Sequence, residues 1–365
     1  MSSEIIADVE LLAPALAVAG RDERLRNAIL DALRQGELDA NEPSAFREQV
    51  RWPLILALLS DVKTHRVVLQ NGLIFDVSLD SRIEKALLLS TESLPDHVWE
   101  PQTTKLLTAL AIGARNVIVG GAYIGDHVAF IARAIAGAGT VHAFEPSSHS
   151  FNRLVHHLKI NNLDNVAVHR VGLWSVSDVA LQLEGDLALG SSVPMLDPER
   201  AFNSVSAFNS VSIDDYVRSQ NLESVGLIML DTEGGEENAL LGAGETITRD
   251  SPNIVFEIHR NFVDWTAGLE RTSVVSSLTA LGYNVFAIRD FHNNYPMADE
   301  AIEVIPVDCV YLDGPPHGFN VLATRDRNLI ERLGLRVVKN VSPKLLLEKD
   351  PALHLPLSMN RLAKS

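Results

Sequence analysis

The stretch "NVIVGGAYIGDHVAF", Asn116 to Phe130, joins a short apolar run to a glycine pair and then to an amphipathic segment. Apolar residues recur at helical spacing in that segment, at Ile124, Val128, Ile131 and Ile135, so the stretch predicts a strand, a tight turn and a helix in succession. Glycine lets a backbone approach a ligand closely, and the helix that follows offers N–H groups at its N-terminus. This layout is typical of a site that holds a nucleotide-type cofactor.

The glycines of this turn depart from G-x-G-x-x-G, the fingerprint of dinucleotide-binding proteins. Gly120 and Gly125 match the ends of the fingerprint, but Ala122 stands where the middle glycine makes room for a pyrophosphate. A nucleoside cofactor without a pyrophosphate is therefore the better prediction.

Short apolar runs from residue 102 onward alternate with segments of helical periodicity. We predict strands at 116–119, 140–144, 166–171, 226–230, 254–258, 284–288 and 306–312. Such alternation predicts an α/β fold, with a doubly wound and mainly parallel sheet covered by helices on both faces. Ligands of these sheets bind at the carboxyl ends of the strands, near the switch in strand order.

The N-terminal part of the chain has helical periodicity instead, for example at Leu25, Ile29 and Leu33. Two β-rich runs follow and are joined at Asn71 and Gly72, which favours a type I′ hairpin because both residues tolerate positive φ. We therefore divide the chain into an accessory helical region (1–63), a hairpin with a leading segment (64–101), a cofactor-binding domain (102–313) and a C-terminal tail packed on it (314–365). The accessory region is predicted to contact the substrate or a second copy of the chain.

The hexapeptide AFNSVS occurs twice in direct succession, at 201–206 and 207–212. So short a repeat does not build a solenoid, and we interpret it as a duplication in a surface loop between the third and fourth strands. A lid over the substrate is the alternative interpretation.

The composition argues against several classes of protein. A formal net charge of −16, without a local cluster of basic residues, disfavours nucleic acid and anionic membranes as partners. No apolar run is long enough to cross a bilayer, and the segment after Met1 has acids where a signal peptide needs basic residues. The single cysteine, Cys309, allows no disulfide within the chain and no cysteine cluster for a metal, and we expect it in a buried strand. We therefore expect a soluble protein of the cytoplasm.

Candidate binding residues follow the second and third predicted strands. Glu145 ends the second strand, where a carboxylate can accept both hydroxyl hydrogens of a ribose. Gly172 and Leu173 follow the third strand, and they would offer backbone and apolar surface to an adenine ring. Trp174 belongs either to that surface or to the core.

Candidate catalytic residues follow the fourth and fifth strands. Asp231 and Glu233 stand at the end of an apolar run, and two like charges there need a proton or a cation to offset their repulsion. Glu257 and His259 are expected on the same rim, where a histidine can take a proton from a hydroxyl group near neutral pH. A carboxylate pair such as Asp231 and Glu233 suits Mg²⁺, but we identify no clear third ligand in the sequence and predict no metal.

Six segments resemble the FkbM-type methyltransferases and occur in the order seen in that family. They are VWEP (98–101), VGGAYIGDHV (119–128), VHAFEPSSHSFNRLVHHLKINNL (141–163), SIDDYV (212–217), LIMLDTEGGEENALLGA (227–243) and PNIVFEIH (252–259). The resemblance covers roughly residues 73–312. It implies a class I methyltransferase fold, Rossmann-like, with seven strands of which the last is antiparallel. It also implies an S-adenosylmethionine-dependent enzyme that methylates a hydroxyl group of a sugar or a natural product.

The resemblance extends to the residues that would bind the cofactor. They are Gly120, Gly121, Ala122, Tyr123, Gly125, Asp126, Glu145, Pro146, Ser147, Gly172, Leu173 and Asp231. The family typically reads D-x-G-A-N-x-G in its first motif, whereas Val119 replaces the aspartate and Tyr123 replaces the asparagine here. Because that aspartate normally helps to hold the amino group of the cofactor, Asp126 or Asp231 is expected to take this task.

Methyl transfer requires the acceptor oxygen, the methyl carbon and the sulfur in line, so positioning supplies much of the rate. A neutral hydroxyl group is a poor nucleophile, and a base should remove its proton as the new bond forms. His259 and Asp231 are the candidates for this base, and Glu233 is expected to orient the acceptor.

Two other functions remain open at this point. A nicotinamide-dependent oxidoreductase is disfavoured by Ala122 and by the lack of a second glycine-rich turn. A non-catalytic nucleoside-binding module of the same fold is supported by the loss of the motif acid at Val119, whereas Glu145, Asp231 and Glu233 count against it.

If Glu145 holds the ribose, Glu145→Ala should weaken the binding of S-adenosylhomocysteine. A hydrogen bond to a charged group contributes about 1.5–3 kcal/mol, or roughly ten- to a hundredfold in affinity. Isothermal titration calorimetry measures this change, and an unchanged affinity in a folded variant would remove the ribose assignment.

Overall fold

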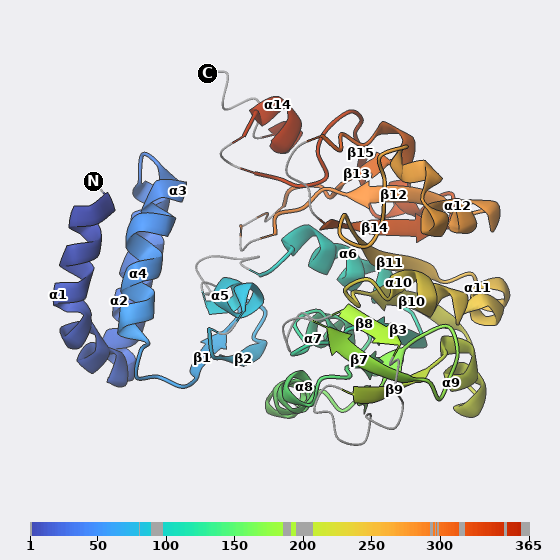
Figure 1. The fold of residues 1–365 in the computed structure, drawn as a ribbon, viewed down its shortest axis with the longest axis horizontal. Helices are drawn as coiled ribbons and strands as arrows, with labels where there is room; N and C mark the ends of the chain where they lie inside the picture. The colour runs from blue at the N-terminus through green and yellow to red at the C-terminus, as the bar shows by residue number, and fades with distance from the viewer. Residues whose placement is uncertain are drawn as a thin grey trace.

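The computed structural model describes residues 2–79, 81–88, 98–184, 191–194, 207–292, 295, 297, 299–313, 318–346 and 349–358. Within this part of the chain, the main body is built on a nine-stranded sheet with the order β15-β13-β12-β14-β11-β10-β3-β4-β5 (Figure 1). Its strands are β3 (Asn116–Gly120), β4 (Thr140–Phe144), β5 (Val166–His169), β10 (Val225–Leu230), β11 (Asn253–His259), β12 (Asn284–Ile288), β13 (Glu303–Pro306), β14 (Gly318–Thr324) and β15 (Arg336–Val337). The predicted α/β class with a doubly wound sheet is confirmed.

The strand order reverses at β3. From β3 the sheet continues in parallel through β4 to β5 on one side, and through β10 to β11 on the other. β14 runs antiparallel between β11 and β12. The resemblance implied seven strands, the last of them antiparallel, whereas β13 and β15 extend this sheet to nine strands. The carboxyl ends of β3 and β10 therefore meet at the switch point, which is where doubly wound sheets bind their ligands.

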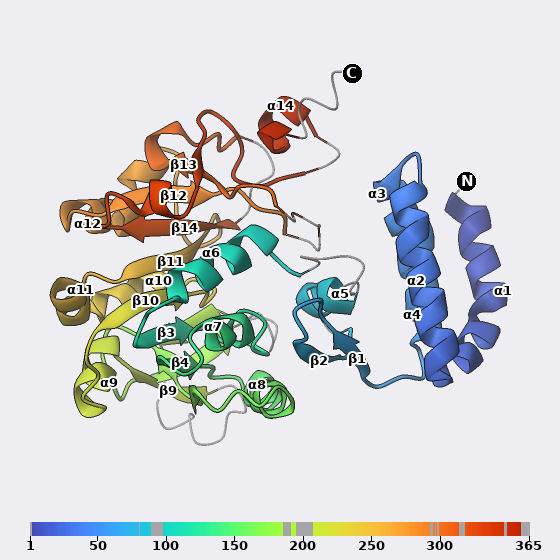
Figure 2. The same cartoon turned by 180° about the vertical axis from the view of Figure 1, so that it is seen from behind.

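Helices cover both faces of the sheet (Figures 1 and 2). An apolar layer lies between the helices and the sheet on each face. Successive residues of a strand point to opposite faces, so Ile118 and Ile228 pack in one layer, and Val119 and Met229 in the other. The first layer takes side chains from α9 (Ile213–Ser219), α10 (Glu236–Leu241), α11 (Gly244–Asp250), the 3₁₀ turn η3 (Leu269–Arg271) and α12 (Ser273–Ala280). The second takes them from α6 (Pro101–Ala111), α7 (Val128–Ala134), α8 (Ser148–Ile160) and α13 (Leu329–Arg332). Among the described residues, no helix combines the length and the apolar character that crossing a membrane would require.

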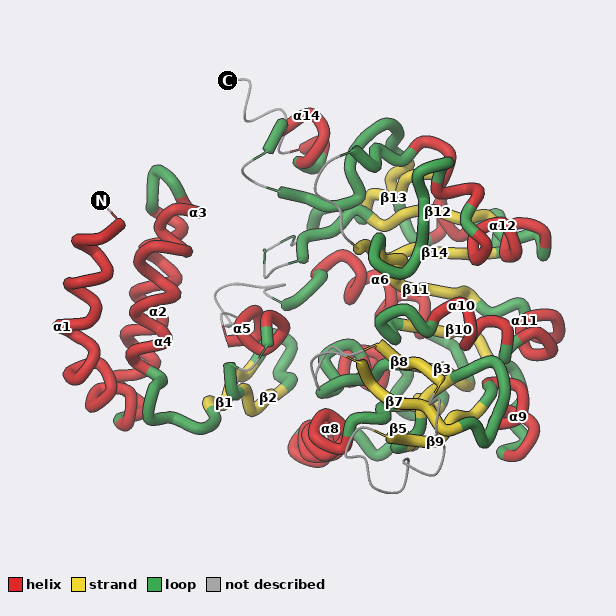
Figure 3. The backbone as a smooth tube through the Cα atoms, viewed as in Figure 1, coloured by secondary structure: helices red, strands yellow, loops and turns green. Residues whose placement is uncertain are grey.

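The N-terminal region is helical, as predicted (Figure 3). It consists of α1 (Ser2–Arg21), α2 (Glu23–Asp39), α3 (Pro43–Phe46), the π-helical turn η1 (Arg47–Arg51) and α4 (Trp52–Leu58). Leu30 and Leu33 of α2 share an apolar cluster with Phe75 of the hairpin and with Ile124 in the glycine-containing loop that precedes α7. The helical region is therefore packed, through the hairpin, against the segment that follows β3.

The predicted hairpin is present as β1 (His65–Val68) and β2 (Ile74–Val77), followed by α5 (Arg82–Leu88). The predicted type I′ turn is wrong, because only Gly72 of the pair has a positive φ, at 79°. The N–H of Gly72 donates to the carbonyl of Leu69 at 2.8 Å. The side chain of Asn71 accepts the N–H of Leu73 at 3.0 Å and stabilises this longer loop instead.

The strand predicted at 306–312 is wrong. β13 ends at Pro306, whose ring leaves no N–H for the ladder, and the 3₁₀ turn η4 (Val307–Cys309) follows. Cys309 is therefore partly exposed in a turn, not buried in a strand. The antiparallel strand is β14, in which all seven residues are buried, so the sheet continues past residue 313, where the C-terminal tail was predicted to begin. The short helix α14 (Pro351–His354) follows it; the division into domains stays a prediction.

A second sheet of four strands has the order β6-β9-β7-β8. Its strands are β6 (Gly172–Leu173), β7 (Ala180–Glu184), β8 (Ser191–Pro194) and β9 (Ala207–Val211). The second copy of AFNSVS forms β9, which pairs with β6 and β7, so the loop interpretation is wrong for that copy. The first copy lies outside the described residues. The third strand of the main sheet correspondingly ends at His169, earlier than predicted.

The loop after β3 packs directly on the end of β10. The N–H of Asp231 donates to the carbonyl of Gly120 at 3.0 Å. Gly121 has a φ of 73°, and a Cβ at this position would lie 1.7 Å from the carbonyl oxygen of Asp231. Glycine is therefore required at residue 121 both by the backbone conformation and by the space.

We predict that Gly121→Ala lowers the free energy of unfolding by about 1–3 kcal/mol or more, because the methyl group must displace β10 or the loop. Gly244→Ala is the matched control, since a Cβ there meets no atom within 4 Å. Urea unfolding of both variants measures the difference, and equal stability of the two would contradict the close approach.

Candidate active site

Glu145 follows β4 and faces the glycine loop. Its carboxylate accepts the N–H groups of Tyr123 and Ser147, each at 2.8 Å. Burial raises the pKa of Glu145 to about 7, although the two N–H groups act in the opposite direction. A carboxylate has about four acceptor positions, so room for the hydroxyl groups of a ribose remains. Glu145 therefore also fixes the loop, and Glu145→Ala is expected to cost some stability as well as affinity.

The other loop residues of the predicted cofactor site lie at the switch point. The N–H groups of Gly121 and Ala122 both donate to the carbonyl of Phe144 at 3.0 Å, which ties the loop to β4. Gly125 has a φ of 89°, as expected for a position that needs glycine. Tyr123, which replaces the family asparagine, joins the apolar cluster of the hairpin with its side chain. This substitution therefore connects the cofactor loop to the N-terminal region.

The residues predicted after β4 and β5 have structural contacts of their own. Ser147 is the N-cap of α8 and accepts the N–H of Ser150 at 3.4 Å, and Pro146 beside it is partly exposed. Leu173 is 3% exposed, and a Cβ at Gly172 would lie 2.5 Å from the ring of Phe208 in β9. The small sheet thus covers part of the surface predicted for adenine, and the adenine contact stays a prediction. Trp174 is buried, beside Gly235.

Behind the glycine loop lies a buried ionic group that the sequence analysis missed. Glu100, at a φ of 48° just before α6, accepts the side-chain N–H of Asn320 at 2.7 Å. It also lies 3.0 Å from Nε2 of His292, and burial lowers the pKa of His292 to about 4. Burial disfavours the cation of His127, but Glu100, Asp126 and Asp231 outweigh this effect and raise the pKa of His127 to about 9. Among the predicted residues, Asp126 joins this group; burial raises its pKa, and the charge of His127 opposes the rise.

Three carboxylates meet where β10 and β11 end. One oxygen each from Asp231, Glu233 and Glu257 lies within 4.8 Å of the other two, and all three side chains are partly exposed. Burial and the neighbouring carboxylates, Glu100 foremost, raise the pKa of Asp231 well above its usual range. The same causes raise the pKa of Glu233 to about 7, with burial again first and Glu236 second. Glu257 supplies the third carboxylate that we could not identify as a ligand in the sequence.

His259 ends β11 on the same rim, but its hydrogen bond does not support the role of base. Its Nδ1 atom accepts the N–H of Asn261 at 3.0 Å. A neutral ring that accepts at Nδ1 carries its proton at Nε2 and therefore donates there. Of the two candidates for the base that takes the acceptor proton, we therefore predict Asp231.

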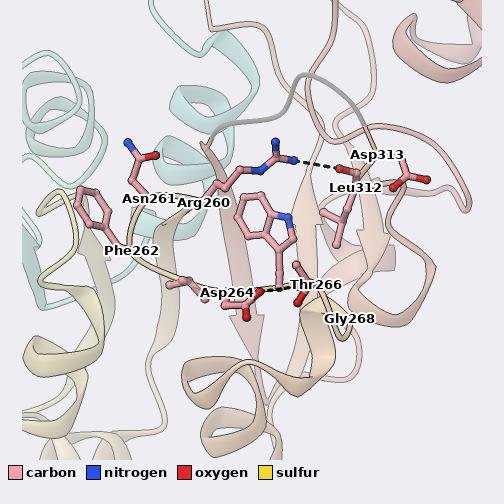
Figure 4. Close-up of a pocket in the computed structure, with 10 residues that line it drawn as sticks. Arg260, Asn261, Phe262, Asp264, Thr266, Gly268, Leu312 and Asp313 are labelled. Carbon is pink, nitrogen blue, oxygen red and sulfur yellow. Dashed lines mark hydrogen bonds between the residues drawn. The ribbon is translucent and has the colours of Figure 1, made fainter.

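A cavity of about 680 Å³ opens beyond the end of β11 (Figure 4). Arg260 borders it, lies 5.6 Å above the ring of Trp265 and donates to the carbonyl of Leu312 at 3.4 Å. Asp264 and Asp313 add carboxylates to its wall. Polar groups around an aromatic ring suit a ligand that carries several hydroxyl groups.

The glycine loop, the acid after β4 and the carboxylates after β10 lie at the carboxyl ends of the parallel strands of the sheet. A model of the methyltransferase FkbM domain matches residues 120–313, more than half of the chain. The chain belongs to the FkbM methyltransferase family. No curated protein matches it.

Solved structures with a similar fold include other methyltransferases. An FkbM methyltransferase from Methylobacillus flagellatus KT is 16% identical over 58% of this chain and 44% of that one, with a TM-score of 0.36. This chain therefore spans less than half of the length of that relative. An O-methyltransferase from Bacillus cereus in complex with SAH is 16% identical over 67% and 91%, with a TM-score of 0.35. An rRNA methylase from Streptococcus thermophilus is 14% identical over 61% and 93%, with a TM-score of 0.31.

We predict that S-adenosylhomocysteine binds more weakly as the pH falls, because a ribose needs the ionised form of Glu145. With a pKa of about 7 for Glu145, affinity should fall about thirtyfold between pH 8 and pH 5.5. Calorimetry across this range measures how the affinity changes with pH. Glu145→Gln should bind S-adenosylhomocysteine weakly at every pH, without this dependence. An affinity that stays constant with pH in the parent protein would contradict the ribose contact.

Proposed function

We propose that the protein transfers a methyl group from S-adenosylmethionine to a hydroxyl group of a sugar or natural-product acceptor. The observation that carries the proposal is the carboxylate cluster of Asp231, Glu233 and Glu257, which lies at the switch point beside the glycine loop. Carboxylates whose pKa is raised are suited to accept a proton near neutral pH.

The cofactor would lie across the ends of β3 and β4. Glu145 would accept the hydroxyl hydrogens of its ribose, and Gly121 would allow its approach to the backbone. Val119 cannot replace the missing motif acid, because its apolar side chain is buried in the sheet. Asp126 is the nearest acid in the same loop, and we assign it to the amino group of the cofactor. His127, charged at neutral pH, would bind the carboxylate at the same end of the cofactor.

The acceptor would occupy the cavity at Arg260 and Trp265 and direct its hydroxyl group towards the carboxylates. When bound, S-adenosylmethionine would supply the methyl group for transfer from its sulfur to the acceptor oxygen. Asp231 takes the hydroxyl proton as this bond forms, while Glu233 orients the acceptor through a hydrogen bond. His259, at the end of β11, would help to position the acceptor.

We predict that Asp231→Asn lowers kcat by about 10²–10⁴, the usual contribution of a general base. His259→Ala should lower it less than tenfold, since this ring acts as a donor. Methyl transfer from labelled S-adenosylmethionine to a panel of glycosides and polyhydroxylated compounds identifies an acceptor, on which both variants are then compared. A larger loss in His259→Ala, with the acid limb of the pH–rate profile removed, would assign the base to His259 instead.

Calorimetry with S-adenosylhomocysteine and with NADH tests the proposal itself. Binding of the first and not of the second supports a methyltransferase, whereas the reverse result would identify an oxidoreductase. Binding of S-adenosylhomocysteine without methyl transfer to any hydroxylated acceptor would instead indicate a non-catalytic module.

A further inference from the structure

We infer that Asp231, Glu233 and Glu257 form a binding site for one divalent cation, Mg²⁺ in the first place. Their three oxygens lie within 4.8 Å of one another, so small rotations of the side chains bring them onto a single ion. The candidate ligands are all hard oxygen atoms, which favours Mg²⁺, Mn²⁺ or Ca²⁺ over Zn²⁺. Because the carboxylates are partly exposed, an ion can reach them from solvent.

The three carboxyl groups of the cluster stand close together, so their ionised forms repel one another. Within the described residues, no basic side chain forms an ion pair with Asp231, Glu233 or Glu257. His127 lies 3.7 Å from Glu100. Burial lowers the pKa of Lys344, and the charges of Glu100 and Glu257 oppose this shift. A divalent cation would remove the mutual repulsion of the three carboxylates.

Asn320 provides an independent observation. It lies directly opposite Glu257 on β14, so both side chains are on the same face of the sheet. Asn320 is 3% exposed; its amide nitrogen donates to Glu100, but its Oδ1 atom has no hydrogen-bond partner. A buried carbonyl oxygen without a donor is costly, and an amide oxygen is a common ligand of Mg²⁺ and Ca²⁺. Asn320 is therefore the fourth candidate ligand.

The ion also specifies the acceptor, an extension that rests on the proposed function. Mg²⁺ holds about six oxygens and usually keeps some positions for water or substrate. Four protein oxygens would leave about two positions for the acceptor. An acceptor with two neighbouring oxygens, such as a vicinal diol, would bind both and present one of them to the methyl group.

The test uses the full chain, stripped with EDTA and titrated with MgCl₂ by calorimetry. We expect one Mg²⁺ per chain and a rise of the melting temperature of about 2 °C or more at saturation. Glu257→Gln should lose at least tenfold in Mg²⁺ affinity, because an amide cannot supply the negative charge of the third carboxylate. Glu237→Gln removes an exposed charge from the same segment and should bind Mg²⁺ like the parent. Glu233→Gln replaces Glu257→Gln if that variant does not fold.

Absence of binding for Mg²⁺, Mn²⁺ and Ca²⁺ in the parent, or equal Mg²⁺ affinity in Glu257→Gln, would overturn the inference. A second titration with S-adenosylhomocysteine separates it from the proposed function. Binding of both ligands together supports the inference, whereas mutual displacement would mean that the carboxylates hold the amino group of the cofactor. S-adenosylhomocysteine binding without any metal binding would refute the metal site alone and leave the methyltransferase proposal intact.

Discussion

The contact between the backbone of Gly121 and the carbonyl of Asp231 sets the geometry of the whole ligand edge. It brings the turn after β3 against the end of β10, with no side chain between them. The same turn is tied to β4 through the carbonyl of Phe144 and through Glu145. Three neighbouring strands thus end at one compact point, and the acids that follow β4 and β10 must lie close together whatever else surrounds them.

This compactness has an electrostatic cost. Burial and like charges act together on Asp231, Glu233 and Glu257, so each holds its proton more firmly than an exposed acid does. A chain that only needed to fold would gain stability from neutral residues here. Keeping the charges is understandable if positively charged partners, a sulfonium cofactor and a metal ion, bind at this edge.

The strands before residue 260 were predictable because each is a short, fully buried run between helical segments. Glu145 and Asp231 were predictable for the related reason that parallel strands bring their carboxyl ends to one edge. Glu100 and Asn320 were not, since they reach the site from segments that precede β3 and follow β12. Their proximity depends on the insertion of β14 into the middle of the sheet, which no local pattern reveals.

Periodicity also failed where two apolar runs compete for one position. The runs at 306–312 and Gly318–Thr324 are both mainly apolar. Only the second forms a strand, because β13 ends at Pro306 and a 3₁₀ turn follows. The hairpin differs for a more local reason, because the side chain of Asn71 bonds to Leu73 and replaces the expected turn. Local sequence signals thus identify helices and strands well. They are less reliable for deciding which of two competing segments or turns forms.

The position of β9 gives the tandem hexapeptide an evolutionary meaning. The second copy supplies a strand and, through Ser212, the cap of α9, which accepts the N–H of Asp215 at 3.1 Å. Because the copies are identical, deleting either one yields the same chain, in which AFNSVS still runs directly into Ile213. Strand, cap and helix would all be retained, and only the connection before them would be six residues shorter. Gain or loss of one copy therefore changes the number of residues between β8 and β9, while the acids that follow β4 and β10 stay the same.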